Sequence, residues 1–253
     1  MCGRFTLTRK KEEIIRSYQE RLETEINDIS EKIYGPNYNV APSQDVAVIY
    51  NNGINTVFDY HHWGLIPHWA KDKKIGYKMI NSRVETVAEK PAFRNSFLHN
   101  RCLIIADGYF EWLKTDKGKV PYYFHIEDHN LFTFAGIRAT WMSGEEVVNS
   151  CSIITTDGVG KAAEVHDRMP IILDPRVEND WINPRMDEKE HLLKLLDFRR
   201  NEHLDYYQVS TAANSPRNNY EEILKKVEQV PVFINEKLNL LYFIFSINIF
   251  SQF

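Results

Sequence analysis

Short runs rich in β-branched and aromatic residues recur along the chain and predict a protein built mainly of β-strands. Turn residues separate these runs, and Asn51-Asn52-Gly53 between two of them is typical of a β-hairpin. The predicted strands are DVAVIY (45–50), TVFDYHHWG (56–64), RCLIIADGYFEWL (101–113), VPYYFHI (120–126), LFTFAGI (131–137) and SCSIITT (150–156).

Apolar residues at helical spacing predict a smaller number of helices. Between residues 9 and 33 the apolar positions recur at mostly helical spacing and acidic residues occupy the other face, which predicts one amphipathic helix. Further helices are expected around 83–89, 160–164, 187–199 and 216–227. No repeat, low-complexity block or Gly/Ser linker divides the chain. We therefore expect one α+β domain with a mainly antiparallel, β-barrel-like core and peripheral helices.

The C-terminal stretch differs from the rest of the chain. The segment LNLLYFIFSINIF is strongly apolar, and Ser246 and Asn248 interrupt it. About a dozen residues are too few for a transmembrane helix, which needs about 20. We expect a domain over residues 1–235 and an apolar tail over 236–253, to which we assign no function.

The overall charge excludes a chain that binds nucleic acid as a polycation. With 31 basic and 35 acidic residues the formal net charge is −4, so any such binding requires a local patch. The segment from His61 to Arg101 is basic, with eight lysines and arginines against three acids. It is either an anion-binding region or a solvated surface.

The cysteines indicate a reducing compartment. Cys2, Cys102 and Cys151 are odd in number, far apart and without CxxC or metal-ligand spacing. The first twenty residues contain no apolar signal-peptide core. We expect an intracellular protein, cytoplasmic if bacterial, with no cofactor and no metal site.

Two motifs place polar side chains beside predicted strands. In KMINSRVET, the residues Asn81, Arg83 and Glu85 alternate and would share one face of an extended segment. In ADGYFEW, the carboxylates Asp107 and Glu111 follow an apolar run, where loss of solvent raises a carboxyl pKa and suits it to general-acid chemistry. Asn81 also fits a simple turn, and Glu111 also fits a surface salt bridge.

A third motif, EVHDRMPIIL, groups His166, Asp167 and Arg168. Histidine titrates near neutral pH and is therefore a candidate proton shuttle. The alternative interpretation of His166 is a structural histidine whose hydrogen bonds are satisfied within the fold.

The basic segment also contains features of single-strand binding. WGLIPHWAKDKK places Trp63 and Trp69 beside Lys71 and further lysines, and aromatic faces flanked by cations are typical of proteins that bind unpaired bases. Both tryptophans also fit a hydrophobic core. Elsewhere in the chain, guanidinium groups could bind phosphate in bidentate fashion, namely those of Arg4, Arg83 and Arg168.

The chain starts with MCGRF, which places a cysteine directly after the initiator methionine. Removal of Met1 would leave Cys2 with a free α-amino group beside its thiol, a 1,2-aminothiol. The alternative is a frayed terminus with no role for Cys2, since the ends of a chain are often disordered.

In combination these motifs resemble the SRAP family (SOS response-associated peptidase). The resemblance rests on MCGRF, APSQ, WGLIPHWAKD, INSRVET, PAFRNSF, RCLIIADGYFEW, FTFAGIRATW, IITT and HDRMPIIL, in this order. It implies a compact α+β fold with a β-barrel-like core and a covalent crosslink to abasic sites, preferentially in single-stranded DNA. It also implies Cys2 as the reactive residue, with Asn81, Glu111 and His166 in support.

The resemblance further implies DNA contacts by Arg4, Arg83 and Arg168, with Trp69 near the DNA path. A free α-amine, with a reference pKa of about 7.7–8.0, can attack the aldehyde of an abasic sugar, and the thiol can then close a thiazolidine ring. The expected partner is single-stranded DNA, with no membrane, and the expected state is a monomer that processes its own Met1. Two other functions remain open: a cysteine-nucleophile hydrolase or peptidase, and a non-catalytic single-strand binder.

Overall fold

The structure is a computed structural model that describes residues 2–32, 34–126, 130–199 and 203–228. The predicted domain end at residue 235 and the predicted tail over 236–253 lie outside these ranges. The strands are β1 (Phe5–Leu7), β2 (Ile26–Asp28), β3 (Asn37–Val40), β4 (Asp45–Asn51), β5 (Thr56–Trp63), β6 (Asn81–Arg83), β7 (Arg101–Ala106), β8 (Gly108–Thr115), β9 (Gly118–Ile126), β10 (Phe132–Ser143), β11 (Glu146–Asp157), β12 (Arg168–Pro170) and β13 (Leu204–Gln208). The α-helices are α1 (Lys11–Leu22), α2 (Val84–Val87), α3 (Arg94–His99), α4 (Pro175–Ile182) and α5 (Lys189–Leu195), and the 3-10 helices are η1 (Lys73–Lys78), η3 (Gly160–Glu164), η5 (Thr211–Asn214) and η6 (Glu221–Leu224).

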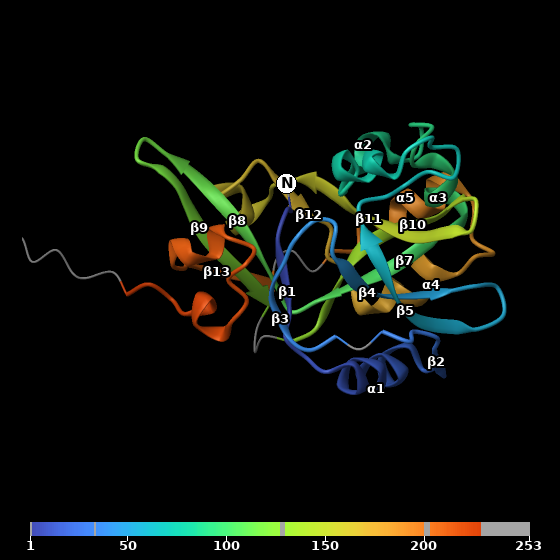
Figure 1. The fold of residues 1–253 in the computed structure, drawn as a ribbon, viewed down its shortest axis with the longest axis horizontal. Coiled ribbons are helices and arrows are strands. Elements are labelled where there is room, and N and C mark those ends of the chain that lie inside the picture. The colour runs from blue at the N-terminus through green and yellow to red at the C-terminus, as the bar shows by residue number, and fades with distance from the viewer. Residues whose placement is uncertain (1, 33, 127–129, 200–202, 229–253) are drawn as a thin grey trace, which may run out of the picture.

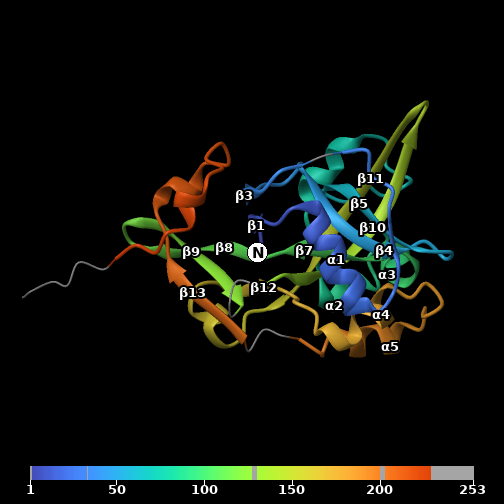
Figure 2. The same ribbon diagram turned by 90° about the horizontal axis from the view of Figure 1, so that it is seen from below.

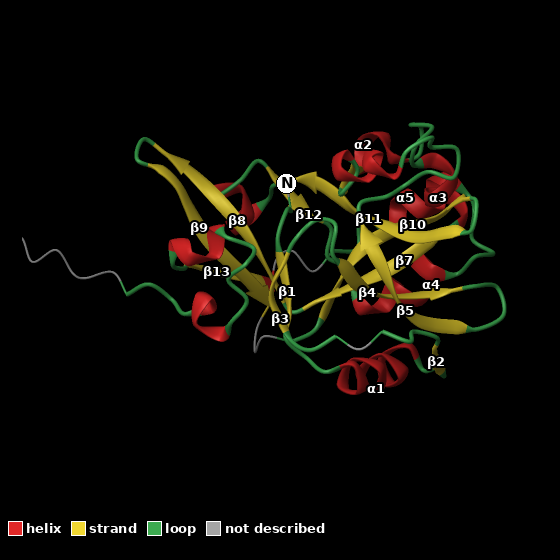
Figure 3. Ribbon diagram, viewed as in Figure 1, coloured by secondary structure: helices red, strands yellow, loops and turns green. Residues whose placement is uncertain are grey.

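Five strands close into a barrel. The order β11–β10–β7–β4–β5 is antiparallel at each step, and β5 returns to β11 through a parallel pairing of His62 with Ser150 and of Trp63 with Cys151. Strands β2, β6 and β12 extend this sheet. The single parallel step makes the barrel mixed, and it confirms the expected α+β domain with a mainly antiparallel barrel-like core (Figure 3).

A second sheet stands beside the barrel. Its order is β13–β9–β8–β1–β3, with antiparallel pairing throughout. In Figures 1 and 2 this sheet lies to the left of the barrel, and β1 lies at the junction between the two. The N-terminal strand therefore starts where the sheet and the barrel meet.

Alternation along the barrel strands divides the hydrophobic core into an inner and an outer layer. On β4, Val46 and Val48 belong to the same buried cluster as Cys2, whereas Ala47 and Ile49 pack with the residues of α1, α4 and α5 outside the barrel. Because both faces are covered, β7 is apolar along most of its length and has no amphipathic alternation.

The helix predicted over 9–33 is shorter than expected. Helix α1 ends at Leu22 because Glu23 adopts a left-handed conformation with φ 49° and ψ 39°, and the chain continues into β2. Beyond Leu22, the apolar residue Ile26 belongs to β2 and not to a helix. It is buried where β2 pairs in parallel with β5. Ile29, one of the apolar positions at helical spacing between residues 9 and 33, is 51% exposed.

The other predicted helices are also shorter. The stretch 187–199 contains α5, the stretch 83–89 contains α2, and 216–227 contains only the 3-10 turn η6. The 3-10 helix η3 matches the predicted range 160–164. Helices α3 and α4 were not predicted, although Asp174 accepts a hydrogen bond from the Arg176 N–H and precedes a proline in the first turn of α4. These are the usual signals of a helix start.

Candidate active site

Cys2 lies just before β1 and is fully buried. The pairing of β1 with β8 brings this end of the chain beside β8, where Phe110 N–H donates to the Arg4 carbonyl at 2.9 Å. Burial raises the pKa of the Cys2 thiol, and the negative charge of Glu111 raises it further. The N-terminal cysteine is therefore held in the fold and is not frayed.

Asp107 anchors strand β1. Its carboxylate accepts hydrogen bonds from the Thr6 hydroxyl at 2.5 Å and from the Thr8 N–H and hydroxyl, both at 2.6 Å. Asp107 is itself buried. Of the two carboxylates in ADGYFEW, this one therefore fixes the segment that follows Cys2.

Glu111 is the second carboxylate of that motif, and it is only 4% exposed. Burial raises the pKa of Glu111, and the charge that the His166 ring has when it is protonated partly offsets this effect. The surface salt bridge is thus excluded as an interpretation of Glu111. A buried carboxyl with a raised pKa is suited to donate and accept a proton.

Asn81 lies on β6, which runs parallel to β11, and not in a turn. Its Nδ2 donates a hydrogen bond to the Cys2 carbonyl at 2.8 Å. Within the described chain, the buried Oδ1 of Asn81 has no hydrogen-bond partner. The amide therefore holds the backbone of Cys2 and keeps one acceptor for another group.

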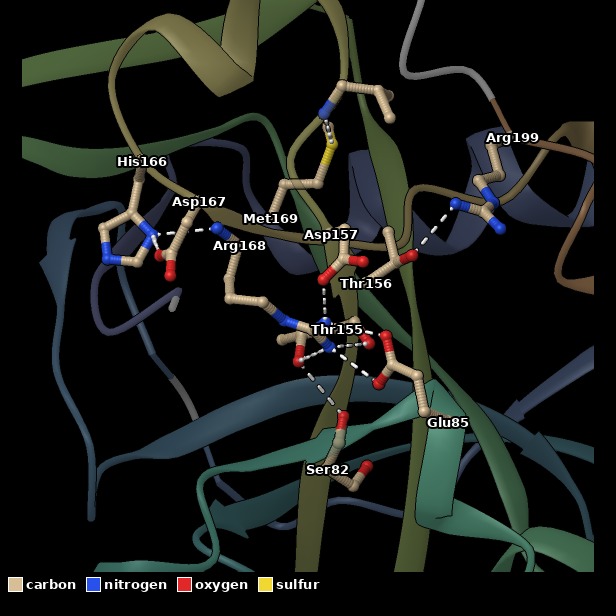
Figure 4. Close-up of polar contacts among 11 residues, drawn as sticks. Ser82, Glu85, Thr155, Thr156, Asp157, His166, Asp167, Arg168, Met169 and Arg199 are labelled. Atoms are coloured by element: carbon tan, nitrogen blue, oxygen red, sulfur yellow. Dashed lines mark hydrogen bonds and ion pairs between the residues drawn. The ribbon is translucent and has the colours of Figure 1, made fainter.

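His166 follows η3 and precedes β12. Figure 4 shows its Nδ1 accepting a hydrogen bond from the Arg168 N–H at 2.9 Å, while an oxygen of Asp167 lies 2.8 Å from the same atom. The Asp167 side chain is 87% exposed, whereas the Arg168 N–H is fixed by β12, so we assign Nδ1 as the acceptor. With Nδ1 as an acceptor, a proton on the ring is placed on Nε2.

Arg168 contacts two carboxylates and a backbone carbonyl within the fold. Its guanidinium contacts both oxygens of Glu85, at 2.7 and 3.1 Å, one oxygen of Asp157 at 2.5 Å and the Thr155 carbonyl at 2.9 Å (Figure 4). The hydrogen bond from Arg168 lowers the pKa of Glu85. Arg168 thus joins α2, β11 and β12, and its charge is neutralised within the fold. The expected phosphate contact of Arg168 stays a prediction.

Glu85 also departs from the expected alternation with Asn81 and Arg83. Strand β6 ends at Arg83, and Glu85 belongs to α2. Arg83 itself is exposed.

The two tryptophans of the basic segment differ in position. Trp63 is fully buried, its Nε1 donates to the Ile80 carbonyl at 2.9 Å, and its ring centroid lies 5.0 Å from that of Phe5. The expectation that Trp63 contacts DNA is therefore wrong, because the residue belongs to the core. Trp69 is 51% exposed, and Lys71 is exposed as well.

Arg4 is half-buried beside the second sheet. Its Nη1 donates to the Asn39 side-chain oxygen at 2.7 Å and to the Ala213 carbonyl at 3.2 Å, and its guanidinium lies 5.8 Å from the Trp112 ring centroid. Asn39 and Trp112 were not predicted to lie near the site. Trp112 directly follows Glu111 in a recognised motif, whereas Asn39 has no comparable signal.

The structure thus brings together the four residues expected to react or to support the reaction. Asn81 donates a hydrogen bond to the Cys2 carbonyl. The charge of Glu111 raises the pKa of the Cys2 thiol, and a charge on His166 lowers the pKa of Glu111. They come from four separate segments of the chain. Within the described residues no group of three or more histidines, cysteines and carboxylates is arranged to hold a metal ion, and no helix is long and apolar enough to cross a membrane.

The barrel, the second sheet and this N-terminal site define the class of protein. The family model of the SOS response associated peptidases (SRAP) matches residues 1–216, and the chain belongs to this family. The abasic site processing protein YoqW of Bacillus subtilis (strain 168) is 42% identical over 228 residues, covering 89% of this chain and 99% of YoqW. The abasic site processing protein HMCES of Xenopus tropicalis is 29% identical, over 90% of this chain and 78% of HMCES.

The fold is shared with solved structures. A crystal structure of a protein from Bacteroides thetaiotaomicron superposes with a TM-score of 0.76 at 26% sequence identity, covering 90% of this chain and all of that chain (100%). A phage-related protein from Bordetella bronchiseptica gives a TM-score of 0.66, also at 26% identity, over 83% of this chain and 95% of its own.

Proposed function

We propose that this protein processes abasic sites in single-stranded DNA by forming a covalent crosslink through Cys2. The observation that supports this most strongly is the convergence of Cys2, Asn81, Glu111 and His166 from four separate segments. The relatives YoqW and HMCES are named abasic site processing proteins, which agrees with this assignment.

The proposed reaction uses both functional groups of Cys2 after removal of Met1, which the protein carries out on itself. The amine attacks the C1′ aldehyde of the open abasic sugar, and loss of one water gives an imine. The thiol sulfur then bonds to the imine carbon while its proton passes to the nitrogen, which closes a five-membered thiazolidine. In total, one water leaves and no oxidant or reductant is needed.

Ring closure explains why a cysteine is needed at this position. A lysine amine would stop at the imine, which hydrolyses or proceeds to β-elimination and strand cleavage. The thiazolidine has no imine, so the DNA strand stays intact. In this reaction Cys2 shields the lesion as well as binding it.

The neighbouring side chains have separate roles in this scheme. Glu111, with its raised pKa, donates a proton to the departing hydroxyl and accepts one from the amine. His166 exchanges a proton with the sugar ring oxygen during ring opening, through Nε2. Asn81 fixes the Cys2 backbone, so that attack on the aldehyde is effectively intramolecular.

Exposed cations and one aromatic ring form the proposed DNA path. Arg83 is the last residue of β6, the strand that contains Asn81, and Trp69 and Lys71 lie in the basic loop that precedes this strand. In Figure 1, α2 at the end of this segment and the acidic helix α1 lie on opposite sides of the barrel. An anionic strand is therefore drawn to the α2 side. Arg4, held by Asn39, completes the path beside the second sheet.

The environment of the thiol argues against the hydrolase alternative. A cysteine nucleophile needs a lowered thiol pKa, whereas burial and Glu111 raise that of Cys2. A protonated thiol suits a reaction in which the amine attacks first. The plain single-strand binder has lost one of its two expected aromatic contacts, since Trp63 is in the core.

A denaturing gel separates these three functions. The protein is mixed with a single-stranded oligonucleotide that contains one abasic site, and with the same oligonucleotide containing a tetrahydrofuran analogue that has no aldehyde. We expect a heat-stable adduct with the first oligonucleotide only, and none with Cys2→Ala or with an N-terminally acetylated protein. An acetylated protein that still forms the adduct would favour thiol attack, and binding without any adduct would favour the plain binder.

A further inference from the structure

Tyr109 has a buried hydroxyl group without a hydrogen bond. The residue is fully buried, and its hydroxyl has no hydrogen-bond partner among the described residues. A buried polar group in this condition lowers the stability of the fold, and such groups are rare in native structures unless a ligand completes them.

The position of Tyr109 places this hydroxyl in the candidate active site. Tyr109 and Glu111 are two residues apart on β8, so their side chains share one face of the strand. Strands β8 and β1 lie side by side (Figure 1). Tyr109 pairs with Phe5 across them, and Cys2 belongs to the same buried cluster as Tyr109. The negative charges that Cys2 and Glu111 can acquire both act on the Tyr109 hydroxyl.

Two aromatic neighbours fix the ring of Tyr109. Phe124 stacks on it with centroids 4.8 Å apart and an interplanar angle of 11°, and Phe134 meets it edge-on at 6.1 Å. A rotation of the ring toward another acceptor would break this packing. The hydroxyl is therefore held ready for a group that enters the site.

We propose that the Tyr109 hydroxyl donates a hydrogen bond to the oxygen on the sugar carbon that Cys2 attacks. This inference rests on the proposed crosslinking function. As the Cys2 nitrogen bonds to C1′, the carbonyl π electrons move onto that oxygen, where negative charge develops. Tyr109 stabilises this charge and keeps its own proton, while Glu111 passes the two protons of the amine to the oxygen one after the other, so that the oxygen leaves as water. Burial raises the pKa of Tyr109, so the phenol remains a donor at neutral pH.

The test uses two buried tyrosines. Tyr109→Phe keeps the ring and removes only the hydroxyl, which has no partner to lose. Tyr18→Phe is the matched control, because Tyr18 is also fully buried but lies in α1, where its hydroxyl accepts a hydrogen bond from Arg21 at 3.2 Å. Imine formation is measured by trapping with cyanoborohydride, and fold stability by thermal unfolding.

We expect Tyr109→Phe to slow imine trapping about tenfold, the low end of the effect of one hydrogen bond to a charged oxygen in the transition state, without lowering the melting temperature. Tyr18→Phe should lower the melting temperature and leave the trapping rate unchanged. A Tyr109→Phe variant that traps at the wild-type rate, or that slows only in proportion to lost stability, would overturn the inference alone. A wild-type protein that forms no adduct would instead overturn the proposed function, and this inference with it.

Discussion

Glu85 and Asp157 both bind the guanidinium of Arg168, and their removal should have very different costs. The Arg168 side chain is 8% exposed, so its charge depends on its partners. Removing one partner of a buried ion pair costs about 3–5 kcal/mol. Glu85 binds through both oxygens but is 45% exposed, so solvent screens the pair and we expect about 2 kcal/mol for Glu85→Ala.

Asp157 is the matched comparison. It makes one contact to the same guanidinium and is 82% exposed, so Asp157→Ala should cost at most about 0.5 kcal/mol. In a domain of this size, 1 kcal/mol shifts the melting temperature by about 2–4 °C. We therefore expect a decrease of about 4–8 °C for Glu85→Ala and at most about 2 °C for Asp157→Ala.

Urea unfolding and thermal unfolding of the two variants measure this difference. The crosslinking rate is measured in parallel, because Glu85 follows the Asn81 strand and Arg168 holds the His166 ring. It should fall in Glu85→Ala and stay unchanged in Asp157→Ala. Equal losses of stability in the two variants would refute the assignment of Glu85 as the main partner of Arg168.

Four further substitutions test other parts of the structure. Glu111→Gln should slow crosslinking yet raise the melting temperature at neutral pH. Burial raises the folded-state pKa of Glu111 above its ordinary 4.5, so wild-type stability is lost as pH rises through the folded value. A pH series in which the difference in melting temperature between the variant and the wild type does not widen above about pH 4.5 would contradict this. Burial lowers the pKa of His61 below its ordinary 6.5, so the free energy of unfolding measured in urea should fall as pH drops through 6.5. It should fall less steeply in His61→Gln, and equal pH dependence in the two proteins would exclude His61 as the cause. Trp63→Ala should cost about 3–5 kcal/mol, whereas Trp69→Ala should leave the melting temperature unchanged and weaken binding of undamaged single-stranded DNA in a fluorescence titration; the reverse outcome would exchange their roles.

Local signals predicted the long barrel strands well, because both of their faces are covered. The predicted run 101–113 is wrong as a single strand, since it divides at Asp107 into β7 of the barrel and β8 of the second sheet, and the short strands β1, β2, β3, β6, β12 and β13 were not predicted. The run Arg101–Ala106 is apolar along most of its length, and the hairpin around Gly53 connects β4 and β5 as its turn residues indicate. Periodicity failed where a short strand followed a helix. The apolar positions after Leu22 fit a continued helix, but the parallel partner of β2 lies about thirty residues further along the chain.

Contacts between distant segments explain the remaining errors at the site. Nothing near Arg168 in the sequence indicates that Glu85 binds it, since the two are 83 positions apart. Trp63 and Trp69 have similar neighbours in sequence, but Trp63 ends a barrel strand while Trp69 lies in a loop. The contact of Asn81 with Cys2 spans 79 positions and was expected only from the family resemblance.

Intact mass spectrometry tests the central proposal most directly. The purified protein is measured before and after incubation with a single-stranded oligonucleotide that contains one abasic site. We expect a protein without Met1 that gains the mass of the oligonucleotide minus one water, in an adduct that survives heat and is unchanged by borohydride. No mass gain by the trimmed protein, or the same gain by Cys2→Ala, would contradict the assignment of Cys2 as the residue that crosslinks to DNA.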